Sequence, residues 1–168
     1  EDTETAEYVI VDDKNAFKDY VTLRTRRKHN DVVLGDSGVV ITEKLSKDLG
    51  VKKGDKITVT SSAGKHAEAV VSGITEMYVN HYVYISTEYY NELFGNIPEH
   101  NRVLINISGD VNETESYMGD EYLSRDYIKG VSFLNANVTR FENMIQSLDL
   151  VTWVLIISAG LLAFVVLY

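Results

Sequence analysis

The sequence predicts an α+β fold, strand-rich with short helices, that is followed by a long C-terminal helix. Short apolar runs separated by Gly, Asp and Ser turn signals recur through the first part of the chain, which is typical of sheet proteins. The last nineteen residues, 150–168, carry no charged side chain, so all sixteen basic and all twenty-five acidic residues lie at or before Asp149. The chain therefore changes from a charged domain to an apolar helix.

The first predicted strand is residues 8–11, an apolar run that ends at two aspartates. Apolar residues then follow at helical spacing at Phe17, Tyr20 and Val21. Asp13 precedes them, and its carboxylate is suited to cap a helix because it can accept hydrogen bonds from free backbone N–H groups. We therefore expect a strand and a short helix here.

One local pattern occurs twice, as VVITEKLSKDLG and as VYISTEYYNELFG. In each copy an apolar strand leads to a hydroxyl residue, Thr42 or Ser86, which is expected to cap a short helix. Each helix is expected to end at a glycine, Gly50 or Gly95. Two copies are too few for a stacked repeat protein, so we interpret them as one device used twice in a single domain.

A hairpin is predicted between the two copies, because residues 56–60 alternate in polarity, residues 61–65 form a turn with Gly64, and residues 67–74 pair back. Three further elements are predicted later: a strand at 103–107, a helix at 111–123 and a strand at 131–134. Strand, helix and strand in this order indicate a split βαβ element.

A stalk helix is predicted at 139–149. Thr139 and Glu142 occupy the N-cap and N3 positions of a capping box, so the helix is expected from about Arg140. An apolar stripe follows on one side of it, at Phe141, Met144, Ile145 and Leu148. We expect this stripe to pack on the front domain or on a neighbouring helix, and no Gly or Pro separates the stalk from the apolar run.

Residues 150–168 are predicted to be a transmembrane helix, truncated at its C-terminal end. At about 1.5 Å per residue the run approaches the thickness of the bilayer hydrocarbon, and Trp153 stands where an interfacial aromatic residue is expected. Small residues predict close packing against another helix: Ser158, Ala159, Gly160 and Ala163. The alternative is a core helix of a larger soluble protein, but the other segments are amphipathic and offer no layer to cover a helix that is apolar all round.

Charge and cysteine content exclude several classes of function. A net charge of −9 argues against nucleic acid as a partner. The absence of cysteine excludes disulfides and thiolate metal sites, and in a domain outside the cell it favours a bacterial surface. The start, EDTETAE, lacks the features of a signal peptide, so the sequence is interpreted as a fragment. Acidic residues precede the span and no basic residue is adjacent to it, so we expect the front domain to lie outside the cell.

No catalytic, cofactor or metal site is predicted. The four histidines, which are His29, His66, His81 and His100, share no ligand spacing. Residues 35–38, Gly-Asp-Ser-Gly, are interpreted as a surface turn because nothing supplies a base beside the serine. The only basic cluster, residues 24–29, has two interpretations: a site for a phosphate or an anionic headgroup, or a solvated loop.

Five of the eleven tyrosines lie in residues 78–90 and form a candidate interaction surface: Tyr78, Tyr82, Tyr84, Tyr89 and Tyr90. Strand alternation puts Tyr82 and Tyr84 on one face and Val83 and Ile85 on the other. If the aliphatic pair is core, the tyrosine pair is exposed and needs a partner such as an extracellular peptide or protein. An ordinary strand face is the equal alternative.

The segment VVITEKLSKDLGVKKGDKITV resembles the extracytoplasmic domains of FtsX-like, MacB-type permeases of ABC transporters. The segment VSGITEMYVNHYVYISTEYYNELFG is similar to the continuation of that domain, and FENMIQSLDLVTWVLIISAGLLAFVVLY to a stalk helix that runs into a membrane span. The resemblance covers roughly residues 8–168, and it transfers no catalytic residue.

The resemblance implies a non-enzymatic role. The chain would comprise an extracytoplasmic domain at 1–138, the stalk, and the start of a span in a bacterial cell membrane. ATP hydrolysis would belong to a separate cytoplasmic ATP-binding subunit, and a second permease copy would complete a dimer. The outer domain would couple ATP hydrolysis to substrate export or to another event outside the membrane, by mechanotransmission. One alternative is a single-pass, membrane-anchored ligand-binding or sensor domain. Another is a membrane-tethered hydrolase, against which the sequence offers no nucleophile–base pair.

Overall fold

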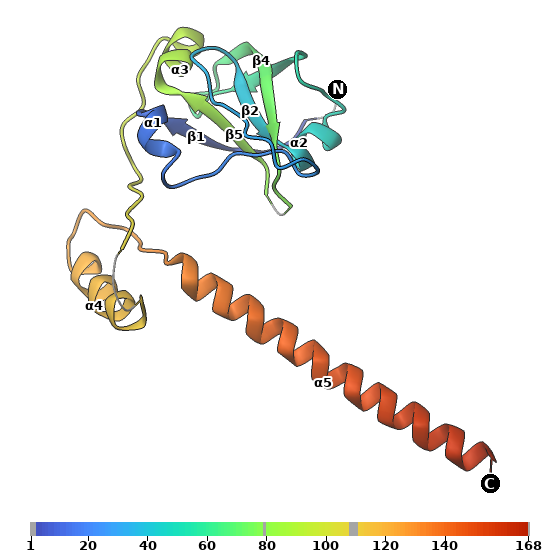
Figure 1. Ribbon diagram of the computed structural model, residues 1–168. Helices are drawn as coiled ribbons and strands as arrows, with labels where there is room; N and C mark the ends of the chain where they lie inside the picture. The colour runs from blue at the N-terminus through green and yellow to red at the C-terminus, as the bar shows by residue number, and fades with distance from the viewer. Residues whose placement is uncertain (1–2, 79, 108–110, 168) are drawn as a thin grey trace. The chain divides into compact units, whose positions relative to one another are not determined.

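The chain forms two compact units, Glu1–Asn106 and Ile107–Tyr168. In the computed structural model the backbone is described for residues 3–78, 80–107 and 111–167 (Figure 1). The division after Asn106 differs from the predicted front domain of 1–138. Each unit is therefore described by itself.

The first unit is built on one mixed sheet of five strands in the order β1-β5-β2-β4-β3. The strands are β1 (Glu7–Val11), β2 (Val39–Thr42), β3 (Lys56–Thr60), β4 (His66–Thr75) and β5 (Tyr82–Ser86), and the helices are α1 (Lys14–Phe17), α2 (Glu43–Asp48) and α3 (Thr87–Phe94). All five predicted strands of this unit are therefore confirmed, as are its three short helices, although α1 ends at Phe17 and does not reach Tyr20 and Val21. Together they make the α+β class predicted from the sequence.

The sheet places the two copies of the repeated device side by side. β2 and β5 are the central strands and run antiparallel, with Val40 opposite Tyr84 and Ile41 opposite Val83. β1 lies parallel to β5, and β4 lies parallel to β2. An approximate two-fold axis between β2 and β5 would therefore exchange these two strands and, with them, their parallel neighbours β4 and β1. β3 completes the sheet as the antiparallel partner of β4.

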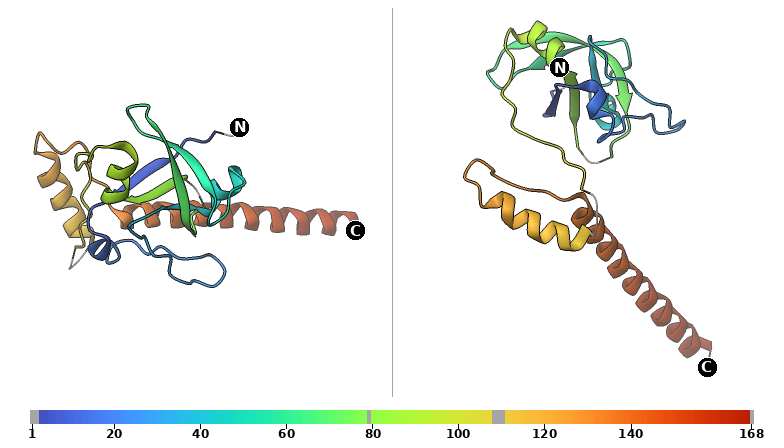
Figure 2. Two further views of the ribbon diagram at one scale, coloured as in Figure 1. Left: turned by 90° about the horizontal axis from the view of Figure 1, so that it is seen from above. Right: turned by 60° about the vertical axis from the view of Figure 1, so that its left-hand side comes forward.

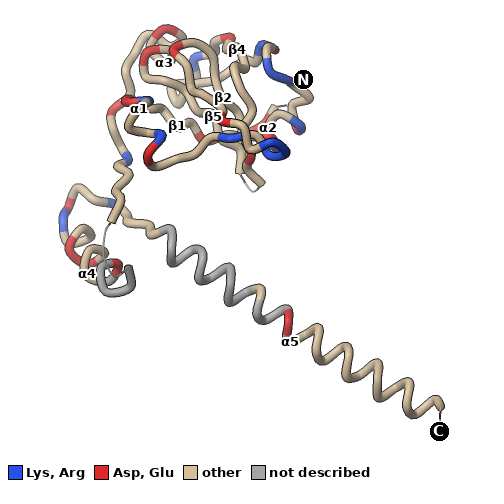
Figure 3. The backbone as a smooth tube through the Cα atoms, viewed as in Figure 1, with Lys and Arg blue, Asp and Glu red and all other residues tan. Residues whose placement is uncertain are grey.

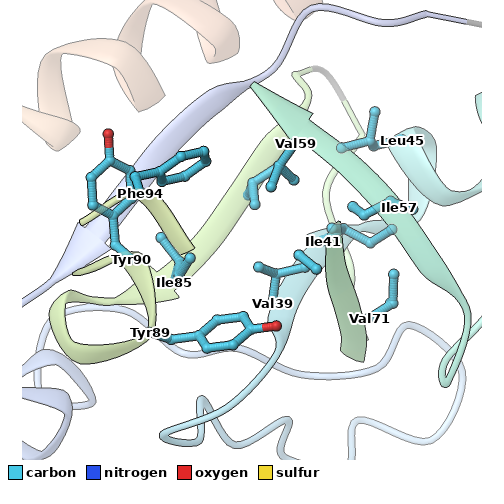
Figure 4. Packing of buried hydrophobic residues seen from close by; sticks show 12 residues of the cluster. Val39, Ile41, Leu45, Ile57, Val59, Val71, Ile85, Tyr89, Tyr90 and Phe94 are labelled. Carbon is cyan, nitrogen blue, oxygen red and sulfur yellow. The ribbon is translucent and has the colours of Figure 1, made fainter. Parts of the chain in front are cut away.

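Both faces of the central strands are covered, which explains why every residue of β2 is buried. The larger apolar cluster lies under α2 and α3 and includes Val39, Ile41, Leu45, Val71, Ile85 and Phe94 (Figure 4). The smaller cluster on the opposite face contains Val11, Leu23, Leu34, Val40 and Tyr84. The alternation of β2 thus supplies both cores, because Val39 and Ile41 face one cluster and Val40 faces the other.

The predicted caps differ in what their side chains bond. Asp13 caps α1 by accepting hydrogen bonds from the backbone N–H groups of Asn15 at 2.8 Å and Ala16 at 3.1 Å. Ser86 caps α3 by accepting from the N–H of Tyr89 at 3.2 Å. Thr42 stands at the N-cap of α2 but makes no such bond. Its hydroxyl instead donates to the carbonyl of Asn80 and accepts from the N–H of Tyr82, the first residue of β5.

Helix α4 (Val111–Leu123) of the second unit confirms the predicted helix, but the split βαβ element predicted across residues 103–134 is wrong. Residues 103–107 form no strand, and Val103 is 78% exposed. Residues 131–133 form no strand either, and Leu134 begins a helix. A segment of alternating polarity forms a strand only where a partner strand supplies hydrogen bonds to its backbone N–H and C=O groups. Neither segment pairs with another strand in the described part of the chain.

The last helix, α5 (Leu134–Leu167), runs through 34 residues without interruption (Figure 2). The prediction of one continuous helix is confirmed, but its start near Arg140 is wrong. Thr139 lies inside the helix rather than at its cap, because regular backbone geometry begins at Leu134. Among the residues that the structure describes, no helix is both long enough and apolar enough to cross a membrane.

Candidate functional site

The five tyrosines of residues 78–90 do not form one surface. Tyr84, Tyr89 and Tyr90 are buried, Tyr82 is half-buried, and only Tyr78 is largely exposed, at 64%. The alternation predicted for β5 is correct, since Tyr84 and Val83 belong to different apolar clusters. The inference that the tyrosine face is exposed is wrong, because a second core covers that face of the sheet.

Each buried tyrosine has apolar or polar neighbours that account for its position. The ring of Tyr84 lies 6.2 Å from that of Phe17 and 6.1 Å from that of Tyr82, measured between centroids. Burial raises the pKa of the Tyr84 phenol. Tyr90 packs on Phe94 with centroids 4.8 Å apart. These rings stabilise the domain and leave no shared platform for a ligand.

The predicted packing residues of α5 are described only in part. Ile145 is 53% exposed, whereas the side chains of Phe141, Met144 and Leu148 lie outside the described residues. Of the small face Ser158, Ala159, Gly160 and Ala163, all four residues are exposed. Ser158 donates its hydroxyl to the carbonyl of Val154 at 2.7 Å, as expected for a hydroxyl in an apolar helix.

The basic cluster is carried by a hairpin at residues 23–32, which sequence reasoning did not predict. Arg24 and Asp31 form an antiparallel bridge, and the N–H of Thr25 donates to the carbonyl of Asn30 at 2.8 Å. His29 adopts a positive φ of 52° at the turn. The tip residues 26–29 are therefore held on a hydrogen-bonded turn rather than on an irregular loop.

The hairpin is also fixed to the sheet. The N–H of Arg24 donates to the Thr75 hydroxyl at 3.1 Å, and the N–H of Glu76 donates to the Arg24 carbonyl at 2.8 Å. Arg24 forms an ion pair with Glu76. The end of β4 thereby positions the hairpin, and with it Arg26, next to α2.

A hollow of about 140 Å³ lies where the hairpin meets α2, lined by Arg26, Glu43, Lys44, Lys47, Met77 and Tyr78. The Arg26 guanidinium lies over the Tyr78 ring, 5.3 Å from its centroid, and 3.8 Å from a carboxylate oxygen of Glu43. Lys47 contacts the same Glu43 oxygen at 2.8 Å. Figure 3 shows the basic stretches on the hairpin and on α2. This hollow is the candidate functional site.

The cationic side chains around the hollow lower the pKa of its one carboxylate, Glu43. The hydrogen bond from Lys47 lowers the pKa of Glu43, and the charges of Lys47, Arg26 and Arg27 lower it further. The carboxylate is thus the resident anion of a cationic surface. Sequence reasoning did not predict that α2 would contribute to the same site as the basic cluster. The available signal was the pair Lys44 and Lys47, which lie on one predicted helix but outside the 24–29 cluster.

A single histidine, His81, contacts α2 near its C-terminal end. The Nε2 atom of His81 is 2.9 Å from an Asp48 oxygen and 3.0 Å from the Lys44 ammonium, and its Nδ1 atom is 3.3 Å from the Thr5 carbonyl. His81 thereby joins the N-terminal segment to α2. No group of three or more His, Asp or Glu residues suited to a metal ion occurs in the described part of the chain.

A larger hollow of about 300 Å³ lies at the base of the hairpin, bordered by Phe17, Val21 and Val32 from the second apolar cluster. Lys14 at its rim forms ion pairs with Asp36 and with Glu88. Asp36 belongs to the turn at 35–38, whose interpretation as a turn before a strand agrees with the bend seen there. Lys18 and Asp31 also line this hollow, so its lining carries an excess of one positive charge, whereas the lining of the smaller hollow carries an excess of two.

Comparison with known proteins identifies no relative. No family model, no curated protein and no solved structure matches the chain. The function is therefore inferred from the sequence and the geometry of the chain.

Proposed function

We propose that this chain is the extracytoplasmic part of a bacterial transporter permease of the FtsX-like, MacB type, with the start of the following membrane span. The observation that carries the proposal is α5, a single helix of 34 residues that enters the uncharged run 150–168 without a break. Its N-terminal part would be the stalk, and the uncharged run would lie in membrane lipid.

The proposed role is mechanical coupling rather than catalysis. A separate cytoplasmic subunit would hydrolyse ATP, and the permease would act as a dimer. A continuous helix transmits displacement over its length, because its backbone hydrogen bonds resist bending. The small sheet domain would then move with α5 and drive export or another event outside the membrane.

Cysteine labelling tests the membrane assignment, because the chain contains no cysteine of its own. Ser62→Cys in the β3–β4 turn and Leu161→Cys in α5 would each be expressed in the full-length protein. We expect a membrane-impermeant maleimide to label the Ser62→Cys protein in intact cells and to leave the Leu161→Cys protein unlabelled, since lipid excludes the reagent. Equal labelling of both in intact cells would contradict the proposal.

A helix break tests the mechanical role. Ile145→Pro removes a backbone hydrogen bond and costs roughly 3 kcal/mol in a helix interior, whereas Ile145→Ala keeps the helix. Spin labels at Ser62→Cys in the two permease copies would report the distance between outer domains. We expect ATP to change this distance with Ile145→Ala but not with Ile145→Pro, while the ATPase still copurifies. An ATP response that survives Ile145→Pro would refute mechanical coupling.

The alternative of a single-pass sensor domain is distinguished by the reading frame on both sides of this sequence. Further spans after Tyr168 and an adjacent ATPase gene support the permease. A signal peptide before Glu1 with a stop soon after Tyr168 supports the single-pass protein instead.

A further inference from the structure

We infer that the hollow between the 23–32 hairpin and α2 binds a phosphate-type anion, either a free phosphate or the phosphodiester of a headgroup. This inference is independent of the proposed transport role. It follows from the way the fold brings together cations that are separate in the sequence.

The cations of the site come from two elements that tertiary structure fixes. Arg26 is placed by the hairpin, whose strands are bonded to each other and to the end of β4. Lys44 and Lys47 are placed by α2, which packs through Leu45 on the main core. Because the backbone at both elements is already fixed, binding of a ligand costs little further conformational entropy.

Charge selects the class of ligand. The tip and α2 carry five cationic side chains, which are Arg26, Arg27, Lys28, Lys44 and Lys47. Three of them, Arg26, Lys44 and Lys47, line the hollow together with one carboxylate, Glu43, which leaves an excess of two positive charges in its lining, in a chain of net charge −9. An acidic protein concentrates cations at one place only at a cost in repulsion, and a bound anion relieves that repulsion.

Phosphate fits the arrangement better than a carboxylate does. Arg26 and Lys47 already share the single carboxylate of Glu43, at 3.8 and 2.8 Å. A competing ligand must bring more charge and more acceptor oxygens than one carboxylate supplies. A phosphate has both, and the planar guanidinium fork of arginine can bind two of its oxygens.

On one side of the hollow, the Tyr78 ring stacks on Arg26 and thereby restricts the positions that the guanidinium can take. The ring of Tyr78 contacts the flat face of the Arg26 guanidinium, and such stacking does not use the N–H groups at the edge of that group as donors. Met77 adds an apolar wall next to the ring. An organic group attached to the phosphate would contact these two side chains.

Titration of the full chain in non-ionic micelles tests the inference. Amide NMR spectra would be recorded with inorganic phosphate, with glycerophosphoglycerol as a soluble headgroup analogue, and with acetate. We expect saturable shifts at Arg26, Lys47 and Tyr78 with at least one phosphate compound. Saturation by inorganic phosphate alone assigns a free phosphate, and tighter binding of the diester assigns a headgroup. Equal shifts with acetate, or no saturation with either phosphate compound, would overturn the inference.

Two matched pairs of variants separate a specific site from net charge. Arg26→Gln and Lys56→Gln each remove one positive charge, but Lys56 pairs with Glu68 on the β3–β4 hairpin. Arg26→Gln should weaken phosphate binding about tenfold, as expected for loss of a charge-assisted hydrogen bond, and Lys56→Gln should not. Glu43→Gln should tighten binding more than Glu68→Gln, because it frees two cations in the hollow. Equal effects within either pair would refute a site at this position.

Discussion

Gly38 is a residue at which the fold leaves no space for a side chain. Its φ is +82°, and an added Cβ would lie 2.8 Å from both the Val70 carbonyl oxygen and the Ser72 Cβ. The glycine allows β2 to start directly against β4, which the sequence could indicate only as a turn signal. Backbone conformation and close approach thus act together at this position.

Gly38→Ala is therefore expected to destabilise the protein by more than Gly64→Ala. Both glycines have positive φ, but an added Cβ at Gly64 meets nothing within 4 Å. Gly64→Ala should cost about 1–2 kcal/mol from backbone strain, and Gly38→Ala should add the cost of the clash to that. Urea denaturation of the two variants measures the difference. Equal losses in the free energy of unfolding would show that contact with β4 is unimportant.

At the scale of elements, the two copies of the strand–cap–helix device have diverged in the use of their cap residue. The Ser86 hydroxyl accepts from the Tyr89 N–H and closes the first turn of α3. The Thr42 hydroxyl instead donates to the Asn80 carbonyl and accepts from the Tyr82 N–H, both at 3.3 Å. The same position in the device therefore stabilises a helix in one copy and the approach to β5 in the other.

This difference predicts different local effects of two substitutions. Ser86→Ala should cost about 1 kcal/mol and lower hydrogen-exchange protection at the Tyr89 amide. Thr42→Val should cost roughly 1–3 kcal/mol through the lost bonds and lower protection at the Tyr82 amide. Amide exchange measured on both variants checks the assignment. Loss of protection in α2 after Thr42→Val would mean that Thr42 does act as a helix cap.

At the scale of the whole molecule, the sheet domain contains its own core. Every residue of the two apolar clusters lies within Glu1–Asn106. Because both clusters lie within this one unit, we expect the sheet domain to fold by itself.

A chain that ends at Asn106 should accordingly unfold with the same urea midpoint as the sheet domain of the full chain, because burial of apolar surface is the main source of stability. Circular dichroism during urea titration measures both midpoints. A truncated chain that lacks a cooperative transition would show that residues after Asn106 support the sheet.

Much of the first unit could be predicted because its signals are local. Strand alternation, the caps Asp13 and Ser86, and the left-handed Gly95 depend on a few neighbouring residues. The strands expected at 103–107 and 131–134 failed because a strand requires a partner, which alternation alone does not supply. The tyrosine surface failed for the related reason that the second core covering Tyr84 comes from distant residues such as Leu23 and Leu34.

The sequence by itself determined the α+β class, the positions of the strands and short helices in the first unit, and a continuous C-terminal helix with an uncharged end. These depend on periodicity, turn residues and charge, which are properties of neighbouring residues. Only the tertiary structure decided the strand order, the burial of the tyrosines and the meeting of Arg26 with α2. Those features arise from contacts between residues far apart in the chain, and such contacts leave no pattern in the sequence of either segment alone.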